Sequence, residues 1–164
     1  MKQRLSRRSI LISTAGVTIL SLSGCLGDDD NDEEDENDRS DEEIAVDWAS
    51  GADNIDDQGD ITDMTGEDSV TVNHGETGDE GNYVSDPGIL QVDSGTEITF
   101  EWVSPGHSLT EVEGEAATIT DWDDHDTDEG EGYEHTVTFD DSGVALWECI
   151  PHRAQNHRGA IIVV

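Results

Sequence analysis

Short stretches of alternating or β-branched apolar residues run through the second half of the chain. In the clearest stretch, residues 96–102, the side chains of Ile98, Phe100 and Trp102 fall on one face of an extended strand. Similar stretches cover residues 70–72, 89–92, 133–139, 144–149 and 159–164, and turns rich in Gly, Pro and Asp separate them. This pattern predicts an all-β fold, an antiparallel β-sandwich.

No convincing amphipathic helix of useful length is predicted over residues 44–164. Residues 44–68 are too acidic and irregular to assign, and a short helix or a loop could pack Trp48 on one end of the strands. Residues 28–43 are almost entirely Asp, Glu and Asn, so their mutual repulsion predicts an extended, disordered tether. We therefore expect one folded domain over residues 44–164.

Residues 1–24 are typical of an export signal. A twin-arginine pattern at Arg7-Arg8 precedes a weakly apolar run that is short for a membrane span. The run ends in Leu22-Ser-Gly-Cys25, which resembles the lipidation signal of exported lipoproteins. We expect lipid on Cys25, the first residue of a 25–43 tether; the alternative is an uncleaved N-terminal anchor. Either arrangement puts the protein on the outer, extracellular face of the cell membrane.

The charge balance is extremely acidic. The 164 residues include 41 Asp and Glu against 7 Lys and Arg, giving a formal net charge of −34. Such a charge repels phosphate backbones, so nucleic acid is excluded as a partner. Acidic surfaces of this kind suit concentrated salt, where the Debye length falls to about 3 Å at 1 M. The composition therefore indicates a halophilic protein.

The best candidate for chemistry is Cys149. If Cys25 carries lipid, Cys149 is the remaining thiol of an exported protein, where an odd cysteine needs a use. His152 and His157 follow it closely, and His107 stands upstream at the start of a strand. A thiolate with two or three imidazoles is a donor set for copper and also for zinc. We therefore expect a metal site at one end of the sandwich.

The motif His107…Cys149-x-x-His152-x-x-x-x-His157, followed by the final strand, resembles the cupredoxins, the blue copper proteins. Among them it is most similar to the membrane-attached halocyanin group of halophilic archaea. The resemblance covers roughly residues 45–164. It implies a Greek-key β-sandwich with one type 1 copper, liganded equatorially by His107, Cys149 and His152. It also implies a carrier of single electrons between membrane respiratory redox proteins, which we expect to be a monomer.

His157 occupies the position where the family has its axial methionine. An imidazole there donates more strongly than a thioether, so it predicts a perturbed type 1 site with a lower reduction potential. Three alternatives remain: Gln155 as the axial donor, His157 pointing to solvent, or a site retuned for zinc or for no metal. The competing function is a copper- or zinc-binding lipoprotein that does not shuttle electrons. An enzyme is not expected, because a four-coordinate site leaves no open position for substrate.

The other histidines receive structural interpretations. His135 shares a strand face with Tyr133 and Val137, which predicts a hydrogen-bonded core residue. His74 and His125 lie in Gly- and Asp-rich stretches and are expected to be solvated loop residues.

Overall fold

The computed structural model describes residues 39–53, 55, 60–79, 81–114 and 116–164. The predicted export signal, Cys25 and residues 25–38 of the predicted tether lie outside the described residues. No helix within the described ranges is both long enough and apolar enough to cross a bilayer.

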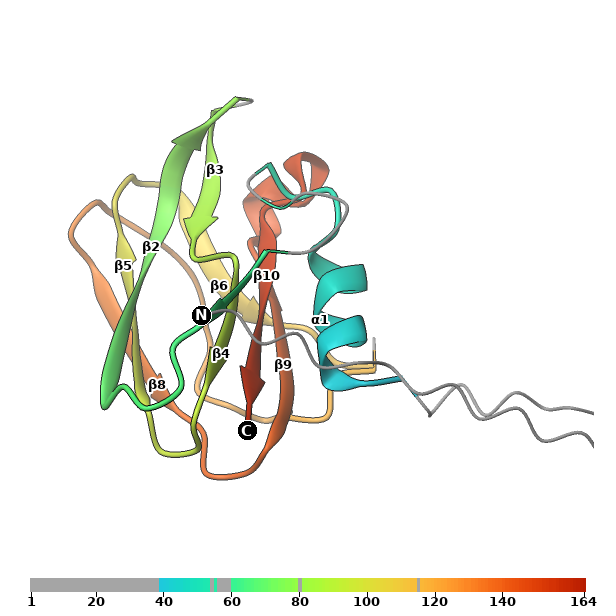
Figure 1. Cartoon of the computed structure of the whole chain (residues 1–164). Coiled ribbons are helices and arrows are strands. Elements are labelled where there is room, and N and C mark those ends of the chain that lie inside the picture. Colours follow the sequence, from blue (N-terminus) through green and yellow to red (C-terminus); the bar gives the residue numbers. More distant parts are fainter. Residues whose placement is uncertain (1–38, 54, 56–59, 80, 115) are drawn as a thin grey trace, which may run out of the picture. The chain divides into compact units, whose positions relative to one another are not determined.

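In the described part of the chain, ten strands form two sheets. The two sheets face each other (Figure 1). The six-stranded sheet has the order β1-β4-β10-β9-β6-β7 and the four-stranded sheet has the order β3-β2-β5-β8. The strands are β1 (Ile61–Asp63), β2 (Ser69–Gly78), β3 (Gly81–Asp86), β4 (Ile89–Val92), β5 (Glu97–Trp102), β6 (His107–Glu111), β7 (His125–Glu129), β8 (Glu134–Thr138), β9 (Gly143–Glu148) and β10 (Arg158–Val163). The predicted Greek-key β-sandwich is confirmed, and each predicted strand is present.

The expectation of purely antiparallel sheets is wrong. β2 runs parallel to β5, and β4 runs parallel to both β1 and β10, while β10–β9, β9–β6, β6–β7, β2–β3 and β5–β8 are antiparallel. Parallel neighbours arise because the chain crosses between the sheets before it returns to the same one. Apolar periodicity specifies which face of a strand is buried and carries no information on the direction of its neighbour.

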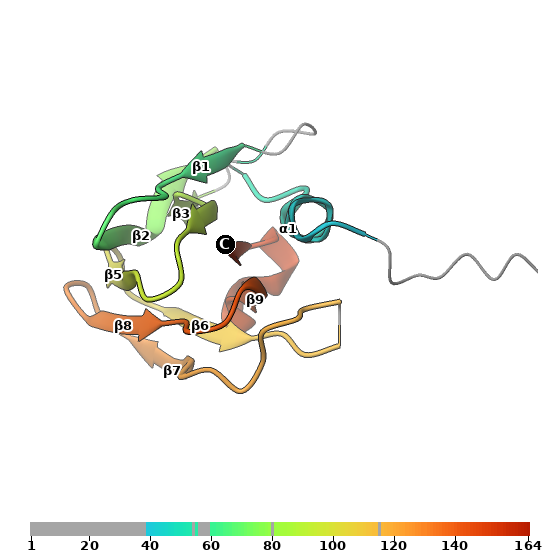
Figure 2. The same ribbon diagram turned by 60° about the horizontal axis from the view of Figure 1, so that its bottom comes forward.

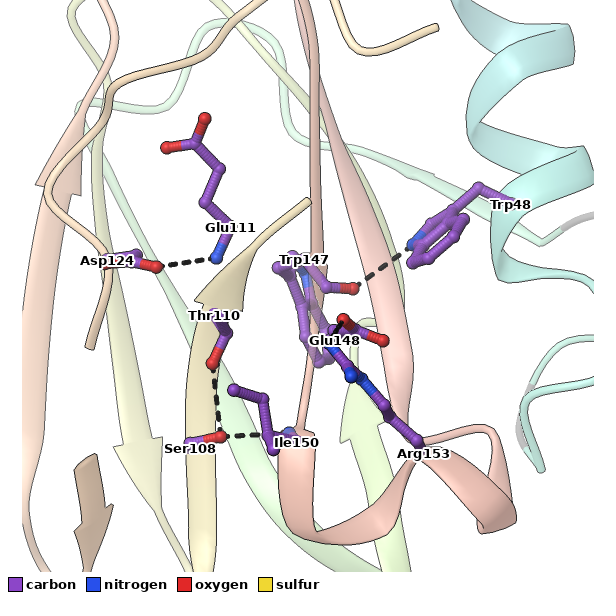
Figure 3. Close-up of polar contacts among 9 residues, drawn as sticks. All are labelled: Trp48, Ser108, Thr110, Glu111, Asp124, Trp147, Glu148, Ile150 and Arg153. Carbon is purple, nitrogen blue, oxygen red and sulfur yellow. Dashed lines mark hydrogen bonds and ion pairs between the residues drawn. The ribbon is translucent and has the colours of Figure 1, made fainter. Parts of the chain in front are cut away.

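A helix, α1 (Asp41–Ala49), precedes the strands. A short helix carrying Trp48 was one of the two possibilities that the sequence left open for residues 44–68. Ser40 and Glu43 form a reciprocal capping box at its start, and three acidic residues in the first turn complement the helix dipole. The ordered helix thus begins three residues before the predicted boundary at Ile44. The Trp48 indole donates a hydrogen bond to the Trp147 carbonyl (3.2 Å), which ties α1 to β9 (Figure 3).

The six-stranded sheet is covered on both faces. One face packs against the second sheet around Phe100, Trp102 and Trp147, and the other packs against α1 through residues such as Val144 and Leu146. Figure 2 shows α1 outside the strands, on the side of β9. Burial of both faces explains why β9 and β10 read as continuous apolar runs instead of alternating. These two rigid strands carry the loop that supplies most of the candidate donors.

Candidate metal centre

The candidate donors meet at one end of the sandwich. His107 is the first residue of β6, and Cys149 directly follows β9. Because β6 and β9 are antiparallel neighbours, the start of one lies beside the end of the other. His152 lies on the short 3₁₀ helix η1 (Ile150–Gln155), and His157 immediately precedes β10. The same end of the six-stranded sheet thus brings together residues that are up to 50 positions apart in the sequence.

Three donor atoms form a compact triangle. The Cys149 Sγ lies 3.7 Å from His107 Nδ1 and 3.3 Å from His152 Nδ1, and the two nitrogens are 3.1 Å apart. The shortest distance at which one point is equidistant from all three corners of this triangle is about 2.0 Å. Usual metal distances are about 2.0–2.1 Å to nitrogen and about 2.3 Å to sulfur. One thiolate and two imidazoles in a trigonal arrangement are the donor set of blue-copper sites.

Ser104 holds His107 in the tautomer that a metal requires. The Ser104 hydroxyl donates to the Gly75 carbonyl (2.6 Å), which can only accept. The same oxygen must then accept from His107 Nε2–H (3.0 Å), so the lone pair of His107 is on Nδ1. Gly75 lets the ring approach this closely, because a Cβ built on it would lie 2.6 Å from two atoms of the imidazole. The backbone of β2 at Gly75 therefore packs directly against the His107 ring and limits its movement.

Ser108 attaches the ligand loop to β6. Its backbone N–H donates to the Cys149 Sγ (3.4 Å), and its hydroxyl accepts from the Ile150 N–H (3.0 Å) and contacts the Thr110 hydroxyl (3.3 Å) (Figure 3). At the other end of the loop, the Cys149 N–H donates to the His157 carbonyl (2.8 Å). Hydrogen bonds thus hold both the sulfur and the backbone N–H of Cys149. The residue is fully buried. A donor aimed at the sulfur stabilises the thiolate form that binds metal.

His152 is the one residue of the predicted donor set that reaches the surface. It is half-buried, whereas the other three are buried, and its ring lies 4.7 Å from that of Tyr83, between ring centroids. The neighbouring Arg153 forms an ion pair with Glu148, the last residue of β9 (Figure 3). That pair raises the pKa of Arg153 and offsets its charge beside the site.

His157 is buried, with 1% of its surface exposed, so the alternative that it points to solvent is wrong. Its Nε2 is 3.0 Å from the Ser85 hydroxyl, and its Nδ1 is buried without a hydrogen-bond partner among the described residues. Burial is the main cause that lowers the pKa of His157, and the neighbouring imidazoles of His74 and His107 lower it further. His157 is therefore neutral, with a buried nitrogen that is left for another kind of partner. The second-ranked axial candidate, Gln155, is half-buried on η1.

His74 was not predicted at the site, and the expectation that it is a solvated loop residue is wrong. It is fully buried on β2, and one donor atom each of His74, His107, Cys149 and His157 lie within 4.8 Å of one another. Burial and the nearby His107 lower its pKa to about 3, so the ring is neutral. The available signal was the alternation that puts residue 74 on the buried face of β2 with Val70 and Val72.

The remaining histidines lie away from this centre. His125 is on β7 instead of in a loop, half-buried, with its Nε2 3.1 Å from Glu129. His135 is hydrogen-bonded as predicted, to the Asp123 carbonyl, but it is half-buried and not part of the core.

These residues fit a copper ion on three structural grounds. The donor triangle has the right size, the tautomer of His107 leaves Nδ1 available, and the buried Nδ1 of His157 has no protein partner among the described residues. A buried polar atom without a partner is costly, and a metal ion would satisfy it. The arrangement suits a one-electron centre that is held rigidly and kept dry.

Comparisons with known proteins agree with this chemistry. The family of copper-binding proteins of the plastocyanin/azurin type matches residues 72–164. Halocyanin from Natronomonas pharaonis is 40% identical over 166 residues, which span 99% of both chains. Among solved structures, pseudoazurin from Methylobacterium extorquens AM1 is 27% identical, with 58% of this chain and 75% of that chain covered and a TM-score of 0.47. Plastocyanin from Dryopteris crassirhizoma is 19% identical, with coverages of 58% and 100% and a TM-score of 0.45.

The match to the family covers more than half of the chain, and the match to halocyanin covers nearly all of it. Members of the family carry electrons and are not enzymes, as the sequence motif implies. The chain belongs to the plastocyanin/azurin family of copper proteins, the cupredoxins, and is an electron-transfer protein similar to halocyanin.

Proposed function

We propose that this protein is a membrane-anchored carrier of single electrons between membrane redox proteins. His107, Cys149 and His152 are its equatorial copper ligands, and His157 is the axial ligand. The observation that carries the proposal is the triangle formed by the first three donor atoms, whose sides are 3.1–3.7 Å.

Rigid placement of the donors is what electron transfer asks of the protein. Copper supplies a one-electron couple between Cu(I) and Cu(II), and the protein has to keep the donor geometry nearly constant in both states. Hydrogen bonds from Ser104 and Ser108 fix the His107 ring and the Cys149 sulfur, and both of these donors are buried. Burial keeps water away from the centre, which limits the reorganisation of solvent when the charge changes.

His152 is the exit for the electron. Its ring contributes Nδ1 to the donor triangle and is itself partly exposed, so it spans the distance from the buried centre to the surface. A redox partner that docks over η1 would meet this ring first.

An axial imidazole distinguishes this site from a methionine site. An imidazole donates more strongly than a thioether, which weakens the copper–thiolate bond and favours Cu(II). We therefore expect a green or red protein instead of a blue one, with a lower reduction potential. Visible absorption and EPR spectra of the copper-loaded protein in high salt test this assignment. An ordinary intense-blue spectrum at neutral pH would refute axial ligation by His157.

Anchoring follows from the N-terminal sequence. The lipidation signal at Leu22–Cys25 and the twin-arginine pattern support attachment to the outer face of the cell membrane through lipid on Cys25. The acidic residues that follow would let the domain reach partners in the same membrane.

A second function is favoured by the donor set itself. The predicted set of Cys149 with His107, His152 and His157 would also make a closed tetrahedral site for zinc, in which case the protein would hold a metal without shuttling electrons. Metal content of the protein purified from its native membrane, together with reversible oxidation and reduction, separates the two functions. Stoichiometric zinc and no redox cycling would establish the second one.

A further inference from the structure

A chain of buried hydrogen bonds runs behind His157. His74 Nε2 lies 3.1 Å from the Ser108 carbonyl oxygen, His74 Nδ1 lies 2.9 Å from the Ser85 hydroxyl, and that hydroxyl lies 3.0 Å from His157 Nε2. His74 and Ser85 face each other across the antiparallel pair of β2 and β3. Each of these residues is at most 2% exposed, so water does not compete for the bonds.

The Ser108 carbonyl at one end of this chain determines which atom of each pair carries the hydrogen. The Ser108 carbonyl can only accept, so His74 Nε2 carries a hydrogen and, in the neutral ring, Nδ1 is a lone pair. The Ser85 hydroxyl must donate its single hydrogen to that lone pair. Its oxygen then accepts from His157, which requires a hydrogen on His157 Nε2 and a lone pair on Nδ1.

We propose that His74 and Ser85 are positioning residues that select the Nε2–H tautomer of His157 and thereby keep the Nδ1 lone pair ready for the metal. This inference deepens the proposed function, because it rests on His157 as the axial ligand. This hydrogen-bond chain is needed where an imidazole replaces a thioether. A thioether has no tautomers and no second polar atom, whereas a buried imidazole needs a partner for its N–H and a defined side for its lone pair.

Ring packing supports the same role. The imidazoles of His74 and His157 stack with centroids 4.6 Å apart and planes 25° apart, which limits rotation of the His157 ring. His74 is in turn enclosed by edge contacts with Trp102 (4.8 Å) and Trp147 (5.3 Å).

The first test needs no substitution. Long-range ¹H–¹⁵N NMR of the imidazoles in the metal-free protein, in high salt at neutral pH, reports which nitrogen of each ring is protonated. We expect hydrogens on Nε2 of both His74 and His157. A hydrogen on Nδ1 of His157 would overturn the proposal.

The second test breaks the chain at His74. In His74→Leu the Ser85 hydroxyl no longer faces the His74 lone pair, and we expect it to donate to His157 Nε2 instead, so the hydrogen of His157 should move to Nδ1. His74→Gln should preserve the wild-type tautomer, because a carboxamide donates to the Ser108 carbonyl and accepts from Ser85. Thr99→Val is the matched control, since it removes an exposed hydroxyl of β5 whose side-chain partner among the described residues is Thr136.

Copper binding supplies an independent readout. We expect His74→Leu to bind Cu(II) about tenfold more weakly and to shift the EPR spectrum toward that of His157→Ala, with His74→Gln and Thr99→Val close to wild type. An unchanged His157 tautomer in His74→Leu contradicts the proposal. If the tautomers behave as expected but His157→Ala leaves the copper spectrum unchanged, the axial role of His157 fails while the positioning chain stands. Should His74→Leu not fold, Ser85→Ala and the wild-type measurement still decide.

Discussion

Gly75 should be the residue whose substitution most directly disturbs the metal centre without removing a donor. It lies on β2 with φ +90°, in the left-handed region that L residues avoid. A Cβ at this position would lie 2.6 Å from Cδ2 and Nε2 of His107 and 2.6 Å from the Ser104 hydroxyl. The ring cannot move aside without breaking its bond to Ser104. Gly75→Ala should therefore both strain the backbone and displace the His107 ring.

The two costs can be separated. Forcing alanine into the left-handed region costs about 1–2 kcal/mol, and overpacking a buried site costs about 1–3 kcal/mol more. Gly66 has nearly the same backbone angle, φ +88°, but nothing lies within 4 Å of its built Cβ. Gly66→Ala should therefore lose only the backbone contribution, about 1–2 kcal/mol, whereas Gly75→Ala should lose about 2–5 kcal/mol of the free energy of unfolding.

Denaturant unfolding of the metal-free proteins at constant high salt gives both values, and copper spectra give the effect on the site. We expect Gly75→Ala to change the visible and EPR spectra because His107 is tilted, and Gly66→Ala to leave them as in wild type. Equal stability losses in the two variants, or an unaltered spectrum for Gly75→Ala, would show that Gly75 does not hold His107.

Three further predictions concern the axial ligand, the anchor and the solvent. His157→Met should give an intense-blue spectrum and a higher reduction potential by voltammetry, because a thioether is the weaker axial donor; an unchanged potential argues against axial histidine. Cys25→Ser should move the protein from the membrane fraction to the soluble fraction and abolish the lipid mass increment, and continued membrane attachment would indicate an uncleaved anchor. The melting temperature should rise as KCl is raised from about 0.1 to 1 M, since salt screens a formal charge of −34; a flat profile contradicts the halophilic interpretation.

The spacing of Cys149, His152 and His157 predicted the loop of the metal centre because that loop is local. The nine residues between β9 and β10 connect two neighbouring strands, so they all lie at the same end of the sandwich. The strand stretches were equally readable, since burial of one face imposes a period of two on the sequence. The family followed from the same motif.

The sequence left helix α1 undecided against a loop, because its apolar positions are few and its surroundings acidic. Its stability comes from the capping box at Ser40 and from packing on a sheet that is remote in sequence. Tertiary contacts of this kind override weak local propensity. The mixed strand directions were likewise invisible, because pairing direction depends on how the chain crosses between the sheets.

The sequence by itself predicted His107, Cys149, His152 and His157 as a donor set, and it determined the scaffold type that carries them. Only the tertiary structure decided that His74 and Ser85 stand behind His157 and that Ser104 and Gly75 stand behind His107. The physical reason is that a tautomer is set by hydrogen bonds across strands, between residues up to 72 positions apart. Such bonds leave no periodic mark on the chain, so they become visible only when the sheets are assembled.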